Sequence, residues 1–272
     1  MRPNLMRPYV YAHRGGLALS PENTMVAFDR AMAEGADGLE LDVRLSRDGV
    51  VVVHHDETLE RTTNGCGPVS ARTADELARV DAGCRFPADG AYPFRGQGIG
   101  IPRLDEVLRR YPGARLIIEM KGDSAELGAA VADVVRKAGA VERALLASFA
   151  HRTVLAARRA GPEVRTGAST PEVRTALYRS WLGLAPRSPA YYGYQLPEKA
   201  GRLRVISPRF VRTVTGASLE VAVWVVNAEA DMRRLLDWGV TGLITDRPDV
   251  AVPIVAGLRQ QTTDHRREPL AR

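Results

Sequence analysis

The amino-acid sequence predicts an α/β fold built on a parallel sheet. Short apolar runs alternate with segments that carry apolar residues at i, i+3 and i+4 spacing, a pattern typical of strands followed by amphipathic helices. Several of these helices are expected to end at a glycine, which suits a left-handed cap. Repeated alternation indicates parallel β/α units. A closed eight-stranded barrel and an open doubly wound sheet both fit, and no GxGxxG or Walker A loop favours the open sheet.

Nine segments are predicted to be strands, so a closed barrel would leave one as a hairpin arm or accessory strand. They are residues 9–13, 38–45, 50–55, 115–119, 144–149, 164–168, 204–207, 221–226 and 242–245. The clearest helices are expected at residues 23–34, 104–111, 124–138, 152–160 and 230–238. Two stretches interrupt the alternation of strands and helices and are interpreted as insertions. They are a loop-rich segment at 57–102 and a proline-rich one within 170–203. The polar residues 260–272 are expected to form a frayed tail.

Length and composition are those of one soluble domain spanning residues 1–272. The chain is 45% hydrophobic and 26% charged, ordinary values for a globular protein. Its formal net charge of +6 is read first as a solvated basic surface and second as an attraction for anionic substrates. Because no basic run is interleaved with aromatic residues, we expect no nucleic-acid partner.

The sequence indicates neither a membrane span nor a disulfide framework. No apolar stretch approaches the roughly 18 residues that a membrane helix needs, and no apolar signal region precedes the first strand, so a cytoplasmic location is expected. Cys66 and Cys84 are the only cysteines, too few for a stapled scaffold. The sequence does not indicate an oligomeric state.

Two acids share one face of the second predicted strand. Glu40 and Asp42 lie two residues apart in an otherwise apolar run, and side chains two apart on a strand point to the same side. Two carboxylates on one face repel each other unless a cation or a proton separates them. Oxygen ligands favour Mg²⁺ or Ca²⁺. The alternative is an acid cluster paired with Arg44.

The strand at 115–119 repeats this arrangement. Glu119 ends an apolar run and Lys121 follows two residues later on the same side. A third acid would complete an oxygen-rich metal site, and the lysine would supply a positive charge for a phosphate oxygen. The alternative is a simple Glu–Lys ion pair that closes the strand.

Histidines gather at the ends of the first and third predicted strands. His13 and Arg14 end the first strand, and His54 and His55 end the third. In β/α barrels the C-terminal ends of the strands carry the active site. Adjacent residues face opposite sides, so only one of His54 and His55 can face the site, and the period does not say which. Two histidines across one site would form an acid–base pair near neutral pH.

The segment Ser20-Pro21-Glu22-Asn23 has a purely structural interpretation. Ser20 would be a helix N-cap with Pro21 at the first helical position. Glu22 would then act only through the helix dipole.

Taken together, these motifs resemble the glycerophosphodiester phosphodiesterase family, in matching order almost from end to end. The motifs are His13-Arg14-Gly15, Pro21-Glu22-Asn23-Thr24, Glu40-Leu41-Asp42-Val43, Asp48-Gly49-Val50 through His55-Asp56, LERTTNG from Leu59 to Gly65, Pro102-Arg103-Leu104, Glu119-Met120-Lys121, Ser148-Phe149, Val223-Trp224, Asn227 and Thr245-Asp246-Arg247-Pro248. The resemblance implies a TIM (β/α)8 barrel with a small insertion after the third strand, corresponding to residues 57–102.

The resemblance also assigns roles to individual residues. It implies one divalent cation, Mg²⁺ or Ca²⁺, held by Glu40, Asp42 and Glu119. His13 and His55 would be the catalytic pair, since His55 directly precedes Asp56 as in the family's His-Asp dipeptide. Of the remaining matches, Arg14 and Lys121 would contact phosphate, Glu22 would be an active-site acid, and Trp224 would lie near the glycerol side of the substrate.

The implied activity is metal-dependent hydrolysis of glycerophosphodiesters to glycerol 3-phosphate and an alcohol. Three alternatives remain open. Phospholipase D-like relatives that act on lysophospholipids or sphingolipids resemble the family at the same positions. A barrel that binds a phosphate ligand without catalysis would keep the fold but not need every acid and histidine. Metal-dependent amidohydrolases usually need a His-x-His on the first strand, where this chain has only His13.

Overall fold

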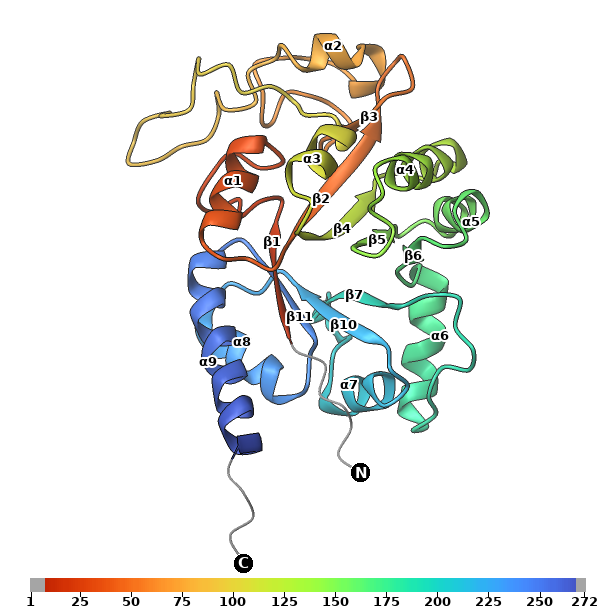
Figure 1. Ribbon diagram of the computed structural model, residues 1–272. Helices are drawn as coiled ribbons and strands as arrows, with labels where there is room; N and C mark the ends of the chain where they lie inside the picture. Colours follow the sequence, from red (N-terminus) through yellow and green to blue (C-terminus); the bar gives the residue numbers. More distant parts are fainter. Residues whose placement is uncertain (1–7, 268–272) are drawn as a thin grey trace, which may run out of the picture.

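Eight parallel strands form a nearly closed barrel in the computed structural model, which describes residues 8–267 and their side chains as far as residue 261 (Figure 1). In pairing order they are β6 (Arg165–Thr166), β5 (Ala144–Ala147), β4 (Arg115–Met120), β2 (Gly38–Leu45), β1 (Tyr9–His13), β11 (Gly242–Thr245), β10 (Glu220–Trp224) and β7 (Gly193–Pro197). One parallel bridge, between Gly167 and Gly193, joins the two end strands. The TIM-type barrel is confirmed, and the open sheet is not formed.

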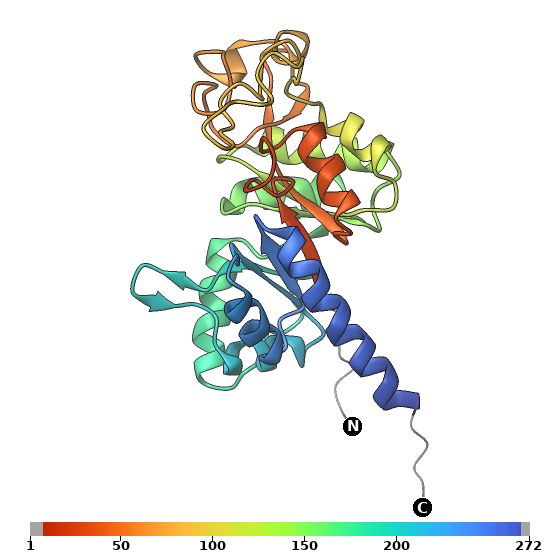
Figure 2. The same cartoon turned by 90° about the vertical axis from the view of Figure 1, so that its left-hand side faces the viewer.

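Helices follow the strands and surround the barrel (Figure 1). They are α1 (Met25–Ala33), α3 (Leu104–Arg110), α4 (Ala125–Lys137), α5 (His151–Ala160), α6 (Thr170–Trp181), α7 (Pro208–Thr215), α8 (Glu229–Asp237) and α9 (Pro248–Arg267). Figure 2 shows α9 extending beyond the strands. The segment 260–272, expected to be frayed, is therefore helical as far as Arg267, and residues 268–272 lie outside the described range.

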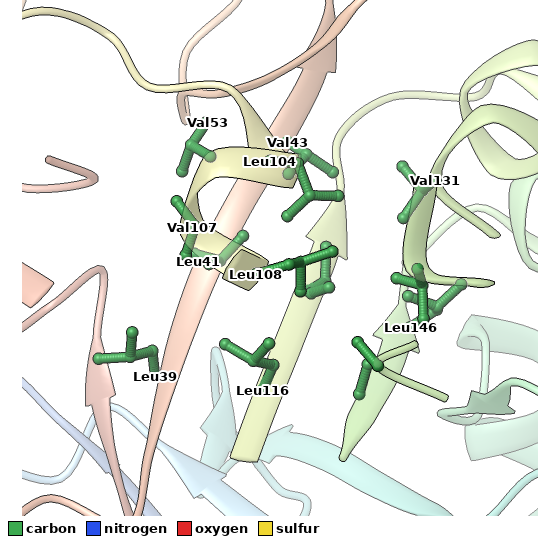
Figure 3. Close-up of a cluster of buried hydrophobic side chains, with 14 of the residues drawn as sticks. Leu39, Leu41, Val43, Val53, Leu104, Val107, Leu108, Leu116, Val131 and Leu146 are labelled. Atoms are coloured by element: carbon green, nitrogen blue, oxygen red, sulfur yellow. The ribbon is translucent and has the colours of Figure 1, made fainter. Parts of the chain in front are cut away.

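Side chains alternate between the two faces of each strand, so one apolar layer lies between the strands and the helices and another lies inside the barrel. On β2, Leu39, Leu41 and Val43 are fully buried against the helices (Figure 3). The intervening Glu40 and Asp42 must point the opposite way, into the barrel. The apolar residues of the barrel interior are Tyr11, Ile117, Leu145, Ala222 and Ile244. The acids therefore lie next to the apolar interior of the barrel, where burying an unpaired charge is costly in free energy.

The layer between strands and helices is expected to dominate stability. Leu104 on α3 is fully buried in it (Figure 3). Leu104→Ala should lower the free energy of unfolding by about 2–5 kcal/mol, because it removes buried apolar surface and leaves a cavity. Leu182→Ala is the matched control, since Leu182 is 73% exposed and its truncation should change stability by less than about 0.5 kcal/mol. Urea titrations of the two variants would compare them, and equal losses would contradict this layer assignment.

The segment around the third predicted strand forms a hairpin arm outside the barrel. β3 (Val51–Val53) pairs antiparallel with β2, so it is the additional strand among the nine that were predicted. Residues 57–102 follow it and hold the short helices η1 (Val69–Ala71) and α2 (Ala74–Leu77). Their apolar side chains form a separate small cluster with β3, made of Val52, Leu59, Val69, Ala74, Leu77, Ala82, Ile99 and Ile101.

One predicted strand was wrong, and a barrel strand was missed. The barrel strand that was missed is β7, the sixth barrel strand along the chain, which lies in the stretch interpreted as an insertion. Tyr194 and Leu196 are buried beneath the helices, while Gln195 between them lines the interior cavity, as strand alternation requires. Residues 204–207 do not form the expected strand. β8 (Lys199–Ala200) and β9 (Leu203–Arg204) instead make a small antiparallel hairpin, after which Val205 and Ile206 are buried in the same cluster as α7.

Candidate active site

The turn after β1 directs His13 and Arg14 to the C-terminal mouth of the barrel. Gly15 has a φ of +86°, and a Cβ at this position would lie 2.7 Å from the Cβ of Ala27 on α1. Only glycine satisfies both the left-handed backbone and this close approach. The backbone N–H of Arg14 donates a 3.1 Å hydrogen bond to Oε2 of Glu40. The turn is thus tied directly to an acid of the neighbouring strand.

The three predicted metal ligands converge. Glu40, Asp42 and Glu119 each place a carboxylate oxygen within 4.8 Å of the other two. Pairing register explains this, because Asp42 is the direct neighbour of Glu119 across β2 and β4. Glu40 and Asp42 are 4% and 1% exposed, so water screens their repulsion poorly.

This donor set fits a divalent cation. Burial, followed by the charge of Asp42, raises the pKa of Glu40 to about 8. A cation among the three acids would remove this cost, because it favours the ionised form of each carboxylate. Three carboxylates without sulfur or imidazole ligands suit Mg²⁺ or Ca²⁺.

The raised pKa of Glu40 predicts how stability depends on pH. Glutamate ordinarily titrates at 4.5, and in the folded metal-free protein the pKa of Glu40 is about 8. Between these values the folded state keeps a proton that the unfolded chain has released, so raising the pH favours unfolding. We expect the melting temperature in EDTA to fall from pH 5 to pH 8, and Mg²⁺ or Ca²⁺ to raise it more at pH 8 than at pH 5.

Glu40→Gln is the control for this measurement, because glutamine mimics the protonated acid without titrating. The variant should lose much of the decline between pH 5 and pH 8 and much of the stabilisation by cation. An unchanged slope would show that other groups cause the decline.

Two basic side chains face the acids. Nζ of Lys121 donates a 2.8 Å hydrogen bond to Oε1 of Glu119 and lies 3.4 Å from Oδ1 of Asp42. Arg14 donates from Nη1 to Oε1 of Glu22 at 2.8 Å. Its buried Nε lies 3.2 Å from Oδ2 of Asp42, yet has no hydrogen-bond partner among the described residues. The positive charges of Lys121 and Arg14 therefore offset part of the repulsion among the acids.

His13 is held by a carboxylate on its far side. Its Nδ1–H donates a 2.6 Å hydrogen bond to Oδ1 of Asp246, while Nε2 lies 4.0 Å from Oε2 of Glu40. Burial alone would lower the pKa of His13, but the Asp246 hydrogen bond and the Glu40 charge outweigh it and raise the pKa. Asp246 is fixed in turn by the side-chain amide of Asn227 at 2.7 Å.

His55 is held in the same way, and His54 is not in the site. Nδ1 of His55 lies 2.6 Å from Oδ1 of Asp56. His54 is 5% exposed and donates from Nε2 to the carbonyl of Thr58 at 3.1 Å. Burial lowers the pKa of His54, as expected for a histidine that remains neutral inside the protein. The geometry therefore places His55, and not its neighbour, on the wall of the site.

These groups line a cavity of about 180 Å³ at the barrel mouth. The lining includes the ionisable groups His13, Arg14, Glu40, His55, Glu119 and Lys121. Most of the other lining residues are apolar, and two of them, Phe149 and Trp224, make an edge-to-face contact at 6.0 Å between ring centroids. Gln195 lines the cavity too. The cavity thus combines a group of charged side chains with a pair of aromatic rings.

Comparison with known proteins decides the family. Residues 13–250 match the family model described as "Glycerophosphoryl diester phosphodiesterase family". The glycerophosphodiester phosphodiesterase of Caldanaerobacter subterraneus subsp. tengcongensis is 32% identical over 255 residues, covering 92% of this chain and 98% of that protein. The chain belongs to this family.

Solved structures of glycerophosphodiester phosphodiesterases share the fold. A glycerophosphodiester phosphodiesterase from Agrobacterium tumefaciens superposes with a TM-score of 0.73 at 32% identity, over 90% of this chain and 98% of that one. An Oleispira antarctica phosphodiesterase in complex with the product sn-glycerol-3-phosphate gives a TM-score of 0.74 at 25% identity, over 92% and 97%. Among residues 8–267 we find no helix long and apolar enough to cross a membrane.

The family's Pro-Glu-Asn-Thr motif has a structural function here. The N-cap of α1 is Thr24, whose hydroxyl accepts from the N–H of Ala27 at 3.2 Å, so the structural interpretation of Ser20 as the cap was wrong. Asn23 clamps β2, because its amide donates to Oδ2 of Asp42 at 3.0 Å and its carbonyl accepts from the N–H of Asp42 at 3.3 Å. The motif therefore orients a candidate metal ligand of the phosphodiesterase barrel.

Several residues of the site received no individual role in the sequence analysis. They lie within the motifs that resemble the family, but nothing in the sequence distinguishes them from polar residues with a purely structural role. They are Asp246, Asn227, Asp56 and Arg61. Asp246 directly follows the C-terminal end of β11, so the strand-end rule that indicated His13 applies to it equally. The contacts of Asp56 and Arg61 depend on how the segment 57–102 folds back, which strand periodicity does not predict.

Proposed function

We propose that this chain hydrolyses glycerophosphodiesters to glycerol 3-phosphate and an alcohol. The observation that carries the proposal is the convergence of the acids Glu40, Asp42 and Glu119, two of which line the same cavity as His13 and His55. Membership of the family and the likeness to a phosphodiesterase bound to sn-glycerol-3-phosphate support it. A barrel that only binds phosphate would not require two carboxylate-oriented histidines beside the acids.

Glu40, Asp42 and Glu119 would hold one divalent cation, Mg²⁺ or Ca²⁺. When bound, such a cation supplies Lewis acidity to a phosphoryl group and lowers the pKa of a neighbouring hydroxyl. The donor set supports this assignment, since it consists of carboxylate oxygens on two adjacent strands.

His13 and His55 would transfer the protons. Each binds a carboxylate through Nδ1, so each can present Nε2 to the cavity. One accepts the proton of the hydroxyl that attacks phosphorus, and the other donates a proton to the oxygen of the alcohol that leaves. A hydroxyl next to the bridging oxygen, as in a glycerol ester, would be the nucleophile, so the alcohol would leave and a cyclic phosphate would form. A water molecule would then open this ring to give glycerol 3-phosphate, with the two histidines exchanging their roles as proton donor and acceptor.

The remaining residues would bind the substrate. Arg14 and Lys121 would exchange part of their contact with the acids for the phosphate oxygens, which stabilises charge that develops at phosphorus. Glu22 would hold Arg14 in place through the 2.8 Å hydrogen bond. Trp224 and Phe149 offer ring faces and edges to the carbon atoms of the glycerol group.

A substrate panel tests the proposal. Purified protein with Mg²⁺ or Ca²⁺ would be assayed on glycerophosphocholine, glycerophosphoethanolamine and lysophosphatidylcholine. Release of the free choline or ethanolamine would be measured for every substrate, and release of glycerol 3-phosphate for the two water-soluble diesters. Asp42→Asn serves as the inactive control. We expect the water-soluble diesters to be cleaved. Cleavage of lysophosphatidylcholine alone would favour a phospholipase D-like enzyme, and binding without turnover of any diester would favour a non-catalytic barrel.

A further inference from the structure

We propose that Arg61, in the segment that follows β3, is a positioning residue of this active site. It ties the carboxylate behind His55 to the carboxylate behind Arg14, and so fixes both groups relative to each other. The inference rests on the proposed function, but it names a residue and a role that neither the motif comparison nor the cavity lining assigns.

The contacts of Arg61 reach two different parts of the site. Its Nε donates to Oδ2 of Asp56 at 2.5 Å. Its Nη1 and Nη2 donate to Oε2 and Oε1 of Glu22, both at 2.8 Å. Asp56 receives His55 on its other oxygen, and Glu22 also receives Arg14. Five side chains therefore form one continuous chain, Arg14–Glu22–Arg61–Asp56–His55.

Only a guanidinium group makes this bridge. Three nitrogens of Arg61 point at three carboxylate oxygens of two residues, and the pair with Glu22 is bidentate. A lysine ammonium is a point donor on a flexible stem and does not reproduce this planar fork. The bridge is half exposed at Arg61, whose side chain is 48% exposed, but Glu22 is only 12% exposed. Removal of Arg61 would leave Glu22 buried and paired with Arg14.

The bridge also determines which nitrogen of His55 carries the proton. Burial would raise the pKa of Asp56, but the hydrogen bonds from Arg61 and His55 outweigh it and lower the pKa. An ionised carboxylate can only accept hydrogen bonds, so Nδ1 of neutral His55 must carry the proton and Nε2 must present its lone pair. Without Arg61, Asp56 can rotate away and the two tautomers compete.

The same argument applies to Arg14. Burial would raise the pKa of Glu22, but Arg61 and Arg14 outweigh it and lower the pKa to about 2. Glu22 is thus an anion shared between two guanidinium groups. If Arg61 is removed, the whole charge of Glu22 acts on Arg14 and competes with the substrate phosphate for it. The segment 57–102 therefore contributes to the reaction through one side chain.

Kinetics on the metal-loaded protein test the role. Arg61→Ala should lower kcat by about 10- to 100-fold, the range found for residues that orient catalytic groups, and Arg61→Lys should not restore it. Added guanidinium ion should partly restore kcat of Arg61→Ala. The matched control is Arg79→Ala, an exposed arginine of the same segment, which should keep wild-type kcat. Thermal unfolding of each variant separates a loss of positioning from a loss of folding.

A double-mutant cycle tests whether Arg61 acts through Asp56. The variant Arg61→Ala/Asp56→Asn should lose much less activity than the product of the two single losses, because both substitutions break one unit. Fully multiplicative losses, or an Arg61→Ala enzyme with the kcat of Arg79→Ala, would overturn the inference.

A readout independent of turnover separates this inference from the proposed function. At a pH at which the ring of His55 is neutral, its ¹⁵N shifts should report the Nδ1–H tautomer in the wild type and a mixture of tautomers in Arg61→Ala. If no diester is hydrolysed but the tautomer still depends on Arg61, the proposed function fails and the positioning role stands. A His55 tautomer that is unchanged in Arg61→Ala overturns the positioning role even if the enzyme is active.

Discussion

His13→Ala and His55→Ala are each expected to lower kcat on a glycerophosphodiester by about 100-fold or more, within the range for general acid–base groups. Both rings are held at Nδ1 by a carboxylate and line the cavity beside the acids. Each substitution removes a proton donor or acceptor without removing a candidate metal ligand. Steady-state kinetics at saturating Mg²⁺ or Ca²⁺, with melting temperatures to show that the variants fold, would measure the effect.

His54→Ala is the matched control for this experiment. His54 precedes His55 in the chain but is buried with its ring nitrogen bonded to the carbonyl of Thr58. Its removal should cost stability and leave kcat near the wild-type value. A loss of kcat in His54→Ala as large as that in His55→Ala would contradict the assignment of the catalytic histidine.

Removal of divalent cation is expected to have an equally large effect. EDTA should abolish hydrolysis, and Mg²⁺ or Ca²⁺ added after removal of the chelator should restore it. The expectation follows from Glu40, Asp42 and Glu119, whose oxygens lie within 4.8 Å of one another. Glu119→Gln should raise the cation concentration needed for half-maximal activity.

Circular dichroism before and after chelation would show that the barrel stays folded, which we expect because its apolar core does not depend on an ion. Full activity in a chelated and dialysed sample would refute cation dependence. It would leave the barrel and the family assignment intact, since neither depends on an ion.

Strand periodicity predicted the acids of the site because Glu40 and Asp42 lie on β2 and Glu119 lies on β4, where successive side chains point to opposite faces. Glu40, Asp42 and Glu119 alternate with apolar residues that are fully buried against the helices. Because side chains alternate along a strand, all three acids point into the barrel. Because the strands are parallel, their C-terminal ends meet at one mouth of the barrel. Strand periodicity could not predict which of His54 and His55 faces the cavity, because this depends on the path of the chain after β3.

The other half of the barrel was harder to predict. β7 reads GYQLP and follows a proline-rich stretch, so it lacks the β-branched run that marks a buried strand. Residues Val205 and Ile206 have that run but are buried against helices after a hairpin. α9 was missed because Pro253 lies inside it, where a proline ordinarily ends a helix. In each case tertiary burial outweighed local preference.

The barrel is not equally firm around its circumference. Six residue pairs join β2 to β4, whereas β5 and β6 share two pairs and a single bridge between Gly167 and Gly193 joins β6 to β7. Amide hydrogen exchange should therefore be slowest behind the carboxylates and fastest along the seam beside Gln195. We therefore expect β2 and β4, which carry the acids that would bind the ion, to be rigid, and the seam from β5 to β7 to be more flexible. A flexible seam next to rigid acids would allow the site to accept alcohol groups of different size.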